Sequence, residues 1–154
     1  MQKVELKLAN FDARITKIEI KPKNVDSKVI MSSKMYDDIT DERVSVKIHF
    51  EEVAAIEFRI NYFDCMIGAE AFGLYCISDM SFVESVVREN FNRRKEVYLM
   101  EGDYNYEEAD EYDLLNTFDV SKEFSQNIED YKAYIQNVDA GVYVIVAKTI
   151  RIER

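Results

Sequence analysis

The alternation of apolar and polar residues along the chain predicts a sheet-rich protein. Apolar side chains occupy every second position over residues 43–50 and again over 55–63, which is the period of a strand with one buried face. A shorter alternation at 4–8 predicts another strand. Residues 14–21 alternate with one break, which predicts a strand with a β-bulge.

The C-terminal part of the chain has a different pattern. Residues 142–147 are apolar without interruption, and alternation resumes from 148 to 152. A run that is apolar on both faces is typical of a central strand covered on both sides, so we expect 142–152 to lie inside the sheet. Short apolar runs also predict strands at 29–31 and 74–77.

Two segments follow the period of an amphipathic helix. Apolar residues recur at helical spacing over 82–94, where Ser81 and Glu84 have the spacing of a capping box. After this helix the chain is expected to become extended at 97–100. A second apolar stripe predicts a helix over 122–136, and it consists of Phe124, Ile128, Tyr131 and Ile135.

The order of these elements predicts the fold class. Strands are grouped early, helices follow, and no strand–helix–strand rhythm repeats along the chain. We therefore expect a single α+β domain over residues 1–154, with a mainly antiparallel sheet and two helices packed against it. The apolar faces of the strands and the apolar stripes of the helices would cover one another.

Composition bounds the compartment. The longest uninterrupted apolar run has six residues, whereas a membrane helix needs about 20, so we expect no membrane partner. The N-terminus alternates charged and apolar residues and lacks the apolar core of a signal peptide, which predicts a cytoplasmic protein. Cys65 and Cys76 have apolar neighbours and fit that compartment as free, mostly buried thiols.

Negative charge is concentrated in one stretch of the chain. The sequence has 30 acidic and 20 basic residues and a formal net charge of -10. Eight of the acids lie in residues 101–119, EGDYNYEEADEYDLLNTFD, which contain no base, so 22 acids and 20 bases remain elsewhere. Such a stretch repels nucleic acid and anionic membranes and attracts a cation or a basic protein.

The acidic stretch begins like a calcium-binding loop but does not continue as one. Asp103, Asn105 and Glu107 match the first ligand positions of an EF-hand. The pattern then requires glycine where Glu108 stands and glutamate where Leu114 stands. No phosphate-binding or dinucleotide-binding fingerprint occurs elsewhere, so we expect no metal site and no cofactor.

The sequence offers little for catalysis. His49 is the single histidine, and the alternation over 43–50 directs it outward, where we expect a surface or partly exposed side chain. One histidine excludes a multi-histidine metal site, and no G-x-S-x-G context supports a serine triad. Only four glycines are available for loops that must approach a ligand closely. We therefore expect no catalytic residues.

The tyrosines of the acidic stretch suggest what it does. Tyrosine offers a large, rigid contact area with a hydroxyl group and is enriched at protein interfaces. The sequence therefore predicts a docking surface for a basic protein, in which carboxylates steer association and tyrosines hold the contact. An exposed acidic loop whose tyrosines pack on the domain is the alternative. The candidate surface consists of Asp103, Tyr104, Tyr106, Glu107, Glu108, Asp110, Glu111, Tyr112 and Asp113.

In size, acidity and general character the chain resembles the small acidic bacterial immunity proteins of polymorphic toxin systems. The segments FEEVAAIEF at 50–58 and GAEAFGLYCI at 68–77 contribute to this resemblance. It implies a non-catalytic inhibitor of the immunity or antitoxin type that binds a basic toxin domain. A structural or regulatory subunit of a phage or bacterial assembly is the second hypothesis. A small-molecule binder or enzyme with a pocket between sheet and helices is the third.

Overall fold

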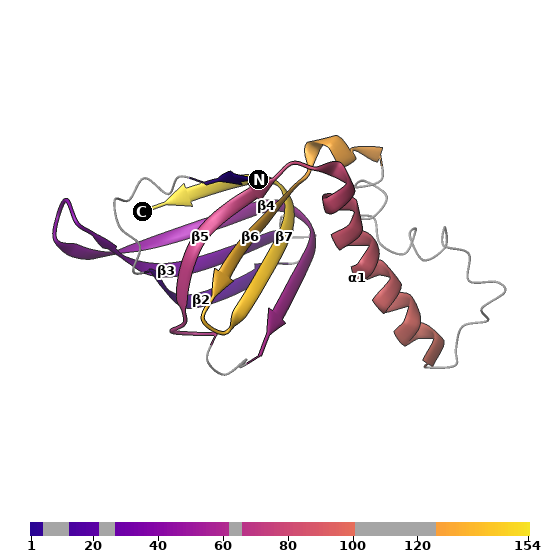
Figure 1. Cartoon of the computed structure of the whole chain (residues 1–154), viewed down its shortest axis with the longest axis horizontal. Coiled ribbons are helices and arrows are strands. Elements are labelled where there is room, and N and C mark those ends of the chain that lie inside the picture. The colour runs from indigo at the N-terminus through magenta and orange to yellow at the C-terminus, as the bar shows by residue number, and fades with distance from the viewer. Residues whose placement is uncertain (5–12, 22–26, 62–65, 101–125) are drawn as a thin grey trace.

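Seven strands form one sheet, and a long helix lies against it (Figure 1). The computed structural model describes residues 1–4, 13–21, 27–61, 66–100 and 126–154. Its elements are β1 (Gln2–Lys3), β2 (Ala13–Lys21), β3 (Lys28–Asp37), β4 (Glu42–Ile60), β5 (Glu70–Ile77), α1 (Met80–Met100), η3 (Ile128–Asp130), β6 (Lys132–Val138) and β7 (Gly141–Glu153).

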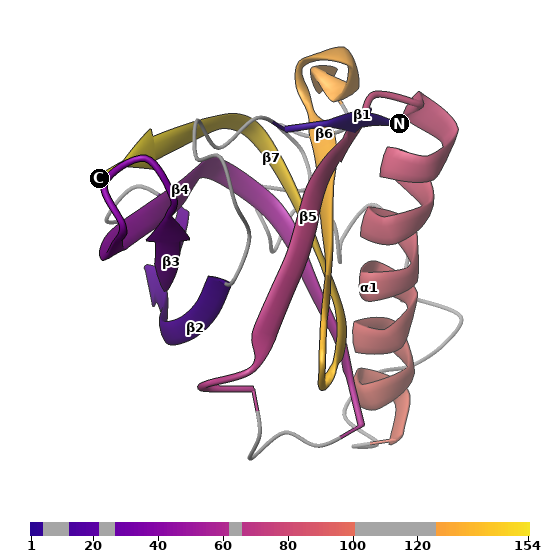
Figure 2. The same cartoon turned by 60° about the vertical axis from the view of Figure 1, so that its left-hand side comes forward.

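The sheet closes on itself through β5. Hydrogen-bonded strands follow the order β1-β5-β2-β3-β4-β7-β6, and β6 also pairs with β5. β5 pairs with β6 along most of its length, with β2 near Ala71 and with β1 near Tyr75. Each of these pairings is antiparallel. Figure 2 shows that the strands of the sheet curve round and that α1 runs along one side of it.

Two apolar clusters hold these layers together. Inside the closed sheet, side chains from six strands, β2 to β7, pack into one core that includes Ile15, Met31, Phe50, Leu74 and Ile145. A second cluster lies between the outer side of the sheet and α1, where Val83 and Val86 meet Ala55, Val144 and Val146. The helix contacts β4, β6 and β7, so it covers one side of the closed sheet.

The prediction that residues 142–152 form a central strand is confirmed. β7 lies between β4 and β6. Tyr143 and Ile145 point into the inner core, whereas Val144 and Val146 are buried beneath α1. The uninterrupted apolar run therefore reflects a strand that is covered on both faces.

The predicted helix over 122–136 is wrong over the described residues, because 132–138 is strand β6 and 122–125 lie outside the described parts. Ala133 and Ile135 face α1, whereas Tyr134 and Val138 face the inner core. This is a period of two. β6 pairs with β5 on one edge and with β7 on the other, and this pairing outweighs a helical spacing of a few apolar residues.

The first predicted helix is longer than expected. α1 runs to Met100, so the expectation of extended chain at 97–100 is wrong. The cap is also different, because Asp79 Oδ1 accepts a hydrogen bond from the Phe82 amide at 3.0 Å and another from Ser81 Oγ at 2.5 Å. Glu84 bonds to Arg88 at 2.8 Å, one turn along the helix. Asp79 therefore takes the capping role predicted for Ser81.

The remaining strands agree with the sequence in kind and differ in length. The two strands predicted at 43–50 and 55–63 are one strand, β4, with a register shift between Val53 and Ala55. The bulge predicted in β2 is confirmed by a register shift between Ile15 and Lys17. The strands predicted at 29–31 and 74–77 extend to the full lengths of β3 and β5. The strand predicted at 4–8 stays a prediction, because Val4 lies just after β1 and 5–8 lie outside the described residues, as do 62–63 of the strand predicted at 55–63.

The fold is a single α+β domain dominated by a mostly antiparallel seven-stranded sheet, with one helix packed against it in the described residues. The predicted class is therefore confirmed at this level, and the predicted second helix is replaced by a strand. When strands close into a ring, one face of the sheet becomes the interior. The alternating segments of this chain each have one apolar face, and closure buries these faces together.

Candidate functional site

The predicted docking surface lies outside the described residues. This applies to all nine of its members, Asp103, Tyr104, Tyr106, Glu107, Glu108, Asp110, Glu111, Tyr112 and Asp113. The described chain stops at Met100, the C-terminal end of α1, and resumes at Gln126 just before η3. η3 contacts α1, so both anchors of the acidic stretch belong to the helix-covered side of the molecule.

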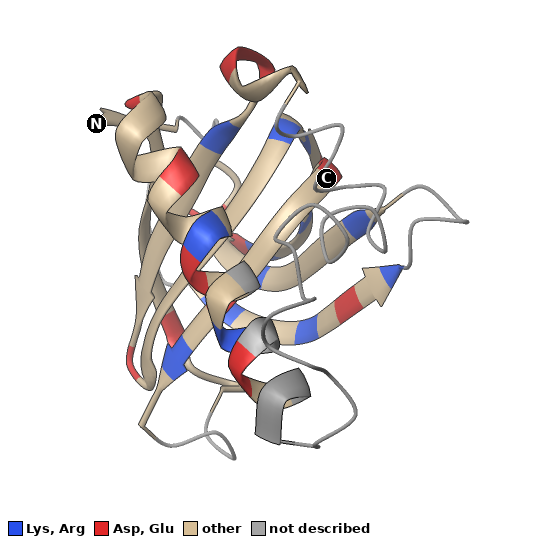
Figure 3. Cartoon of the chain, turned by 90° about the vertical axis from the view of Figure 1, so that its right-hand side faces the viewer, with Lys and Arg blue, Asp and Glu red and all other residues tan. Residues whose placement is uncertain are grey.

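Many of the described charges pair with one another. Figure 3 shows acidic and basic residues alternating along α1 and the strands beside it. On the helix, Arg93 bonds to Glu96 at 2.8 Å, and Glu89 reaches Arg59 of β4 at 3.5 Å. Arg59 also bonds to Glu57 on its own strand. Because these pairs are exposed, each contributes little to stability, but together they neutralise much of this face.

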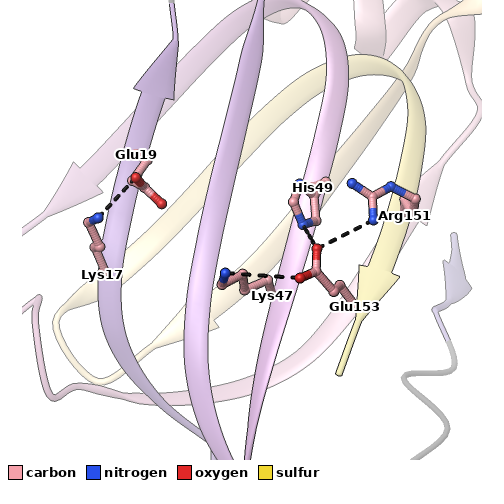
Figure 4. A network of polar contacts seen from close by, with 6 residues as sticks. All are labelled: Lys17, Glu19, Lys47, His49, Arg151 and Glu153. Atoms are coloured by element: carbon pink, nitrogen blue, oxygen red, sulfur yellow. Dashed lines mark hydrogen bonds and ion pairs between the residues drawn. The ribbon is translucent and has the colours of Figure 1, made fainter.

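A polar cluster fastens the end of β7 to β4 (Figure 4). His49 Nε2 lies 2.8 Å from Glu153 Oε2, and the same carboxylate lies 4.0 Å from Lys47 Nζ and 3.4 Å from Arg151. On β2, Lys17 bonds to Glu19 at 2.9 Å. The cluster consists of side chains on the outer face of the sheet, away from the inner core.

The expectation of a surface or partly exposed His49 is wrong, because the residue is buried, with only 6% of it accessible to solvent. Its outward direction agrees with the alternation, but its strand is paired on both edges. Ile30 of β3 and Arg151 of β7 are its cross-strand neighbours. A side chain with such neighbours on both edges of its strand and with an ion-pairing partner beside it is enclosed even though it points outward.

The His49–Glu153 contact has a defined direction. A carboxylate only accepts hydrogen bonds, so Nε2 of His49 carries the proton and donates it. This hydrogen bond lowers the pKa of Glu153, and the positive charge of Lys47 acts in the same direction. Nδ1 of His49 is buried and has no hydrogen-bond partner among the described residues. No described hydroxyl or thiol bonds to His49, so the pair lacks the nucleophile of a triad.

The middle of β4 contains a bend that the sequence pattern does not predict. Glu52 has a φ of 53° and Ser27, at the start of β3, has a φ of 40°. The Val53 amide donates to the Ser27 carbonyl at 2.8 Å, and Ser27 Oγ donates to the Val53 carbonyl at 2.7 Å. Positive φ at such residues costs about 1–3 kcal/mol each, and these bonds help to hold the bend in place.

A surface hollow of about 280 Å³ lies at this bend. It is lined from β2, β3, β4 and α1, and it opens to solvent between the end of the β2–β3 pair and the helix. Its walls include Ile20, Lys21, Val53 and Asn90. The sequence signals the bend only through the loss of alternation after Phe50. It gives no signal for the hollow as a whole, because the other walls of the hollow come from distant segments.

Cys76 is a free thiol that is half-buried against the inner core, and Cys65 lies outside the described residues. The described segments contain no group of three or more histidine, cysteine or carboxylate side chains placed to hold a metal ion. No helix in them has the length and apolar character needed to cross a membrane.

Comparison with known proteins adds no relative. Neither a scan against protein-family models nor searches of curated proteins and solved structures match this chain.

Proposed function

We propose that this chain is a non-catalytic protein-binding domain of the immunity or antitoxin type, which binds a basic protein such as a toxin domain. The observation that carries the proposal is the concentration of eight carboxylates and three tyrosines in residues 101–119 with no basic residue among them. Steering between opposite charges accelerates association, and tyrosines provide contact area that slows dissociation.

The charge balance of the rest of the chain supports this assignment. Outside 101–119 the sequence has 22 acids and 20 bases, a net charge of -2, so the acidic stretch supplies -8 of the -10. Among the described residues, the carboxylates of Glu51, Glu57 and Glu84 are each paired with a base. A basic partner would therefore be attracted mainly by the acidic stretch.

Two kinds of residue have separate roles in the proposed surface. The carboxylates supply the attractive field, and they are Asp103, Glu107, Glu108, Asp110, Glu111 and Asp113. The aromatic side chains supply the buried contact, and they are Tyr104, Tyr106 and Tyr112. Carboxylates should affect the association rate, and tyrosines the dissociation rate.

The test begins with affinity purification of a tagged chain from its native host to obtain a purified basic partner. Association is then followed by stopped flow at several salt concentrations. Reversing Glu107, Glu108, Asp110 and Glu111 to lysine should slow association and weaken its salt dependence. Alanine at one of the three tyrosines should speed dissociation, by about 2 kcal/mol if it is a hot spot.

A matched control separates a local surface from overall charge. The same change of charge is made at four exposed carboxylates outside the stretch, Asp38, Glu42, Glu129 and Asp130. This control variant should associate with the partner much faster than the variant with lysine at 107, 108, 110 and 111. Equal slowing by the two variants, or an unchanged rate at low salt for the 107–111 reversal, would assign binding to another surface.

A further inference from the structure

The hollow at the bend of β4 has the composition of a small binding site. Its floor is largely apolar, because Ala54 and Ile56 are partly exposed there, Ile20 is exposed at its side, and the buried Val29, Val53 and Ala55 lie next to them. Its volume of about 280 Å³ is just below the roughly 300–1,000 Å³ typical of small-molecule pockets. A short apolar ligand would fit that space.

The bend that shapes the hollow is a built feature. Ser27 and Glu52, both with positive φ, flank the two hydrogen bonds that join Ser27 to Val53. Next to them lies the register shift between Val53 and Ala55. Bulges and strained residues are concentrated near binding sites. Strained residues persist only where the surrounding structure holds them in place.

The charges at the hollow select the sign of a ligand. Lys21 and Lys28 belong to its lining, and no described carboxylate does. Lys28 Nζ lies 3.2 Å from Glu51, so this ammonium group is already balanced in part. Lys21 is exposed and makes no ion pair with any described carboxylate. A positive rim above an apolar floor, in a chain of net charge -10, favours a ligand with an anionic head and an apolar body.

We propose that this hollow binds a small amphipathic carboxylate, independently of the protein-binding proposal. The apolar body of the ligand lies on Ile20, Ala54 and Ile56, and its carboxylate meets Lys21 at the rim. The Asn90 side chain closes the α1 side, where its amide bonds to the Ile56 carbonyl at 3.4 Å.

Octanoate is a suitable probe, titrated into the ¹⁵N-labelled full chain and followed by amide chemical shifts. Octan-1-ol and octylammonium have the same apolar body with a neutral and a positive head. We expect saturable shifts at the amides of Lys28, Ala54 and Ile56 with octanoate, weaker binding of octan-1-ol, and no binding of octylammonium.

Variants separate the role of the charge from the role of the space. Lys21→Gln should weaken octanoate binding about three- to fivefold and leave octan-1-ol unchanged, whereas Lys34→Gln, exposed elsewhere on β3, should change neither. Ala54→Leu should fill the hollow and abolish binding of both ligands. If this variant does not fold, the exposed Lys21 variant still decides the question.

Three results would overturn the proposal. They are shifts that map to another part of the chain, equal binding of the three ligands, and octanoate binding that is unaffected by Lys21→Gln.

Discussion

Gly141 begins β7 immediately after the turn residues Asp139 and Ala140. Its φ is 150°, a conformation that side chains rarely adopt, and a Cβ atom there would overlap the carbonyl oxygen of Arg59 on β4. Both the backbone angle and the close approach of β4 therefore require glycine at this position. The sequence marks the turn, but it does not reveal that another strand lies against it.

Replacing Gly141 with alanine should lower the free energy of unfolding by about 3 kcal/mol or more, because the clash involves backbone that cannot move alone. Gly73→Ala is the matched control. Its Cβ would lie 3.1 Å from the ring of Tyr75, which is a flexible side chain, and its cost should be about 1 kcal/mol or less. Urea denaturation measures both variants, and equal losses would contradict this account of Gly141.

Glu153 gives a prediction for the dependence of stability on pH. The hydrogen bond from His49 is the largest cause of its lowered pKa. A carboxylate with a lower pKa in the folded chain stabilises the fold fully above its unfolded pKa of roughly 4.3. This stability is lost as the pH falls through the folded pKa.

Glu153→Gln should therefore reduce stability near neutral pH and flatten the loss of stability below about pH 5. The effect is modest because Glu153 is partly exposed to solvent. Glu129→Gln, on the exposed side of η3, is the control and should leave the pH profile unchanged. Urea midpoints between pH 7 and pH 3 measure the effect, and identical profiles for the wild type and Glu153→Gln would show that the contact contributes nothing.

At the scale of elements, the difference between β7 and β6 shows what the sequence could predict. The run at 142–147 contains its own signal, because a strand covered on both faces needs apolar residues at every position. β6 contains two interleaved sets of apolar residues whose meaning depends on β5 and α1. A helix is equally consistent with the local sequence, because a few of these apolar residues also have helical spacing. Only the strands that pair with β6 decide between a helix and a strand.

The candidate site shows the same limit. The loss of alternation after Phe50 was visible, but the positive φ of Glu52 depends on its surroundings. The hollow also needs Lys21 from β2 and Asn90 from α1, which lie far apart in the sequence. His49 was placed on the correct face of its strand, but its burial depends on residues from β3 and β7.

The start of α1 provides a prediction at the scale of an element. Asp79 accepts bonds from the Phe82 amide and from the Ser81 hydroxyl, and these bonds lower the pKa of its carboxyl group. Asp79→Ala should lower the free energy of unfolding by about 1 kcal/mol, because a helix amide loses its acceptor.

Ser81→Ala distinguishes the two candidate caps. It removes the hydroxyl bond to Asp79 but leaves the bond from the Phe82 amide, so its cost should be clearly smaller. Thermal denaturation followed by far-UV circular dichroism measures both variants. A larger loss for Ser81→Ala than for Asp79→Ala would restore the capping box that the sequence predicted.

At the scale of the whole molecule, the closed sheet and the charge distribution have separate tasks. The inner core is filled by side chains from six strands, and α1 covers a second apolar cluster outside. The acidic stretch, which lies outside the described residues, carries eight carboxylates and no base. Its charge therefore adds self-repulsion to the chain, and the proposed binding function explains why such a charge would be kept.

This separation predicts how stability responds to neutralising the stretch. Glu107→Gln, Glu108→Gln, Asp110→Asn and Glu111→Gln together change the net charge from -10 to -6 (-10 + 4 = -6). At low salt, where the Debye length reaches about 30 Å, the variant should be slightly more stable than the wild type because repulsion is reduced. In 1 M salt the Debye length is about 3 Å, and the difference in stability should disappear.

Thermal denaturation at both salt concentrations measures this difference. The control has the same change of charge at exposed carboxylates outside the stretch, and it consists of Asp38→Asn, Glu42→Gln, Glu129→Gln and Asp130→Asn. A variant at 107–111 that is less stable than the wild type at both salt concentrations would mean that these carboxylates support the fold itself, and the acidic stretch would then lose its assignment as a surface kept for a partner.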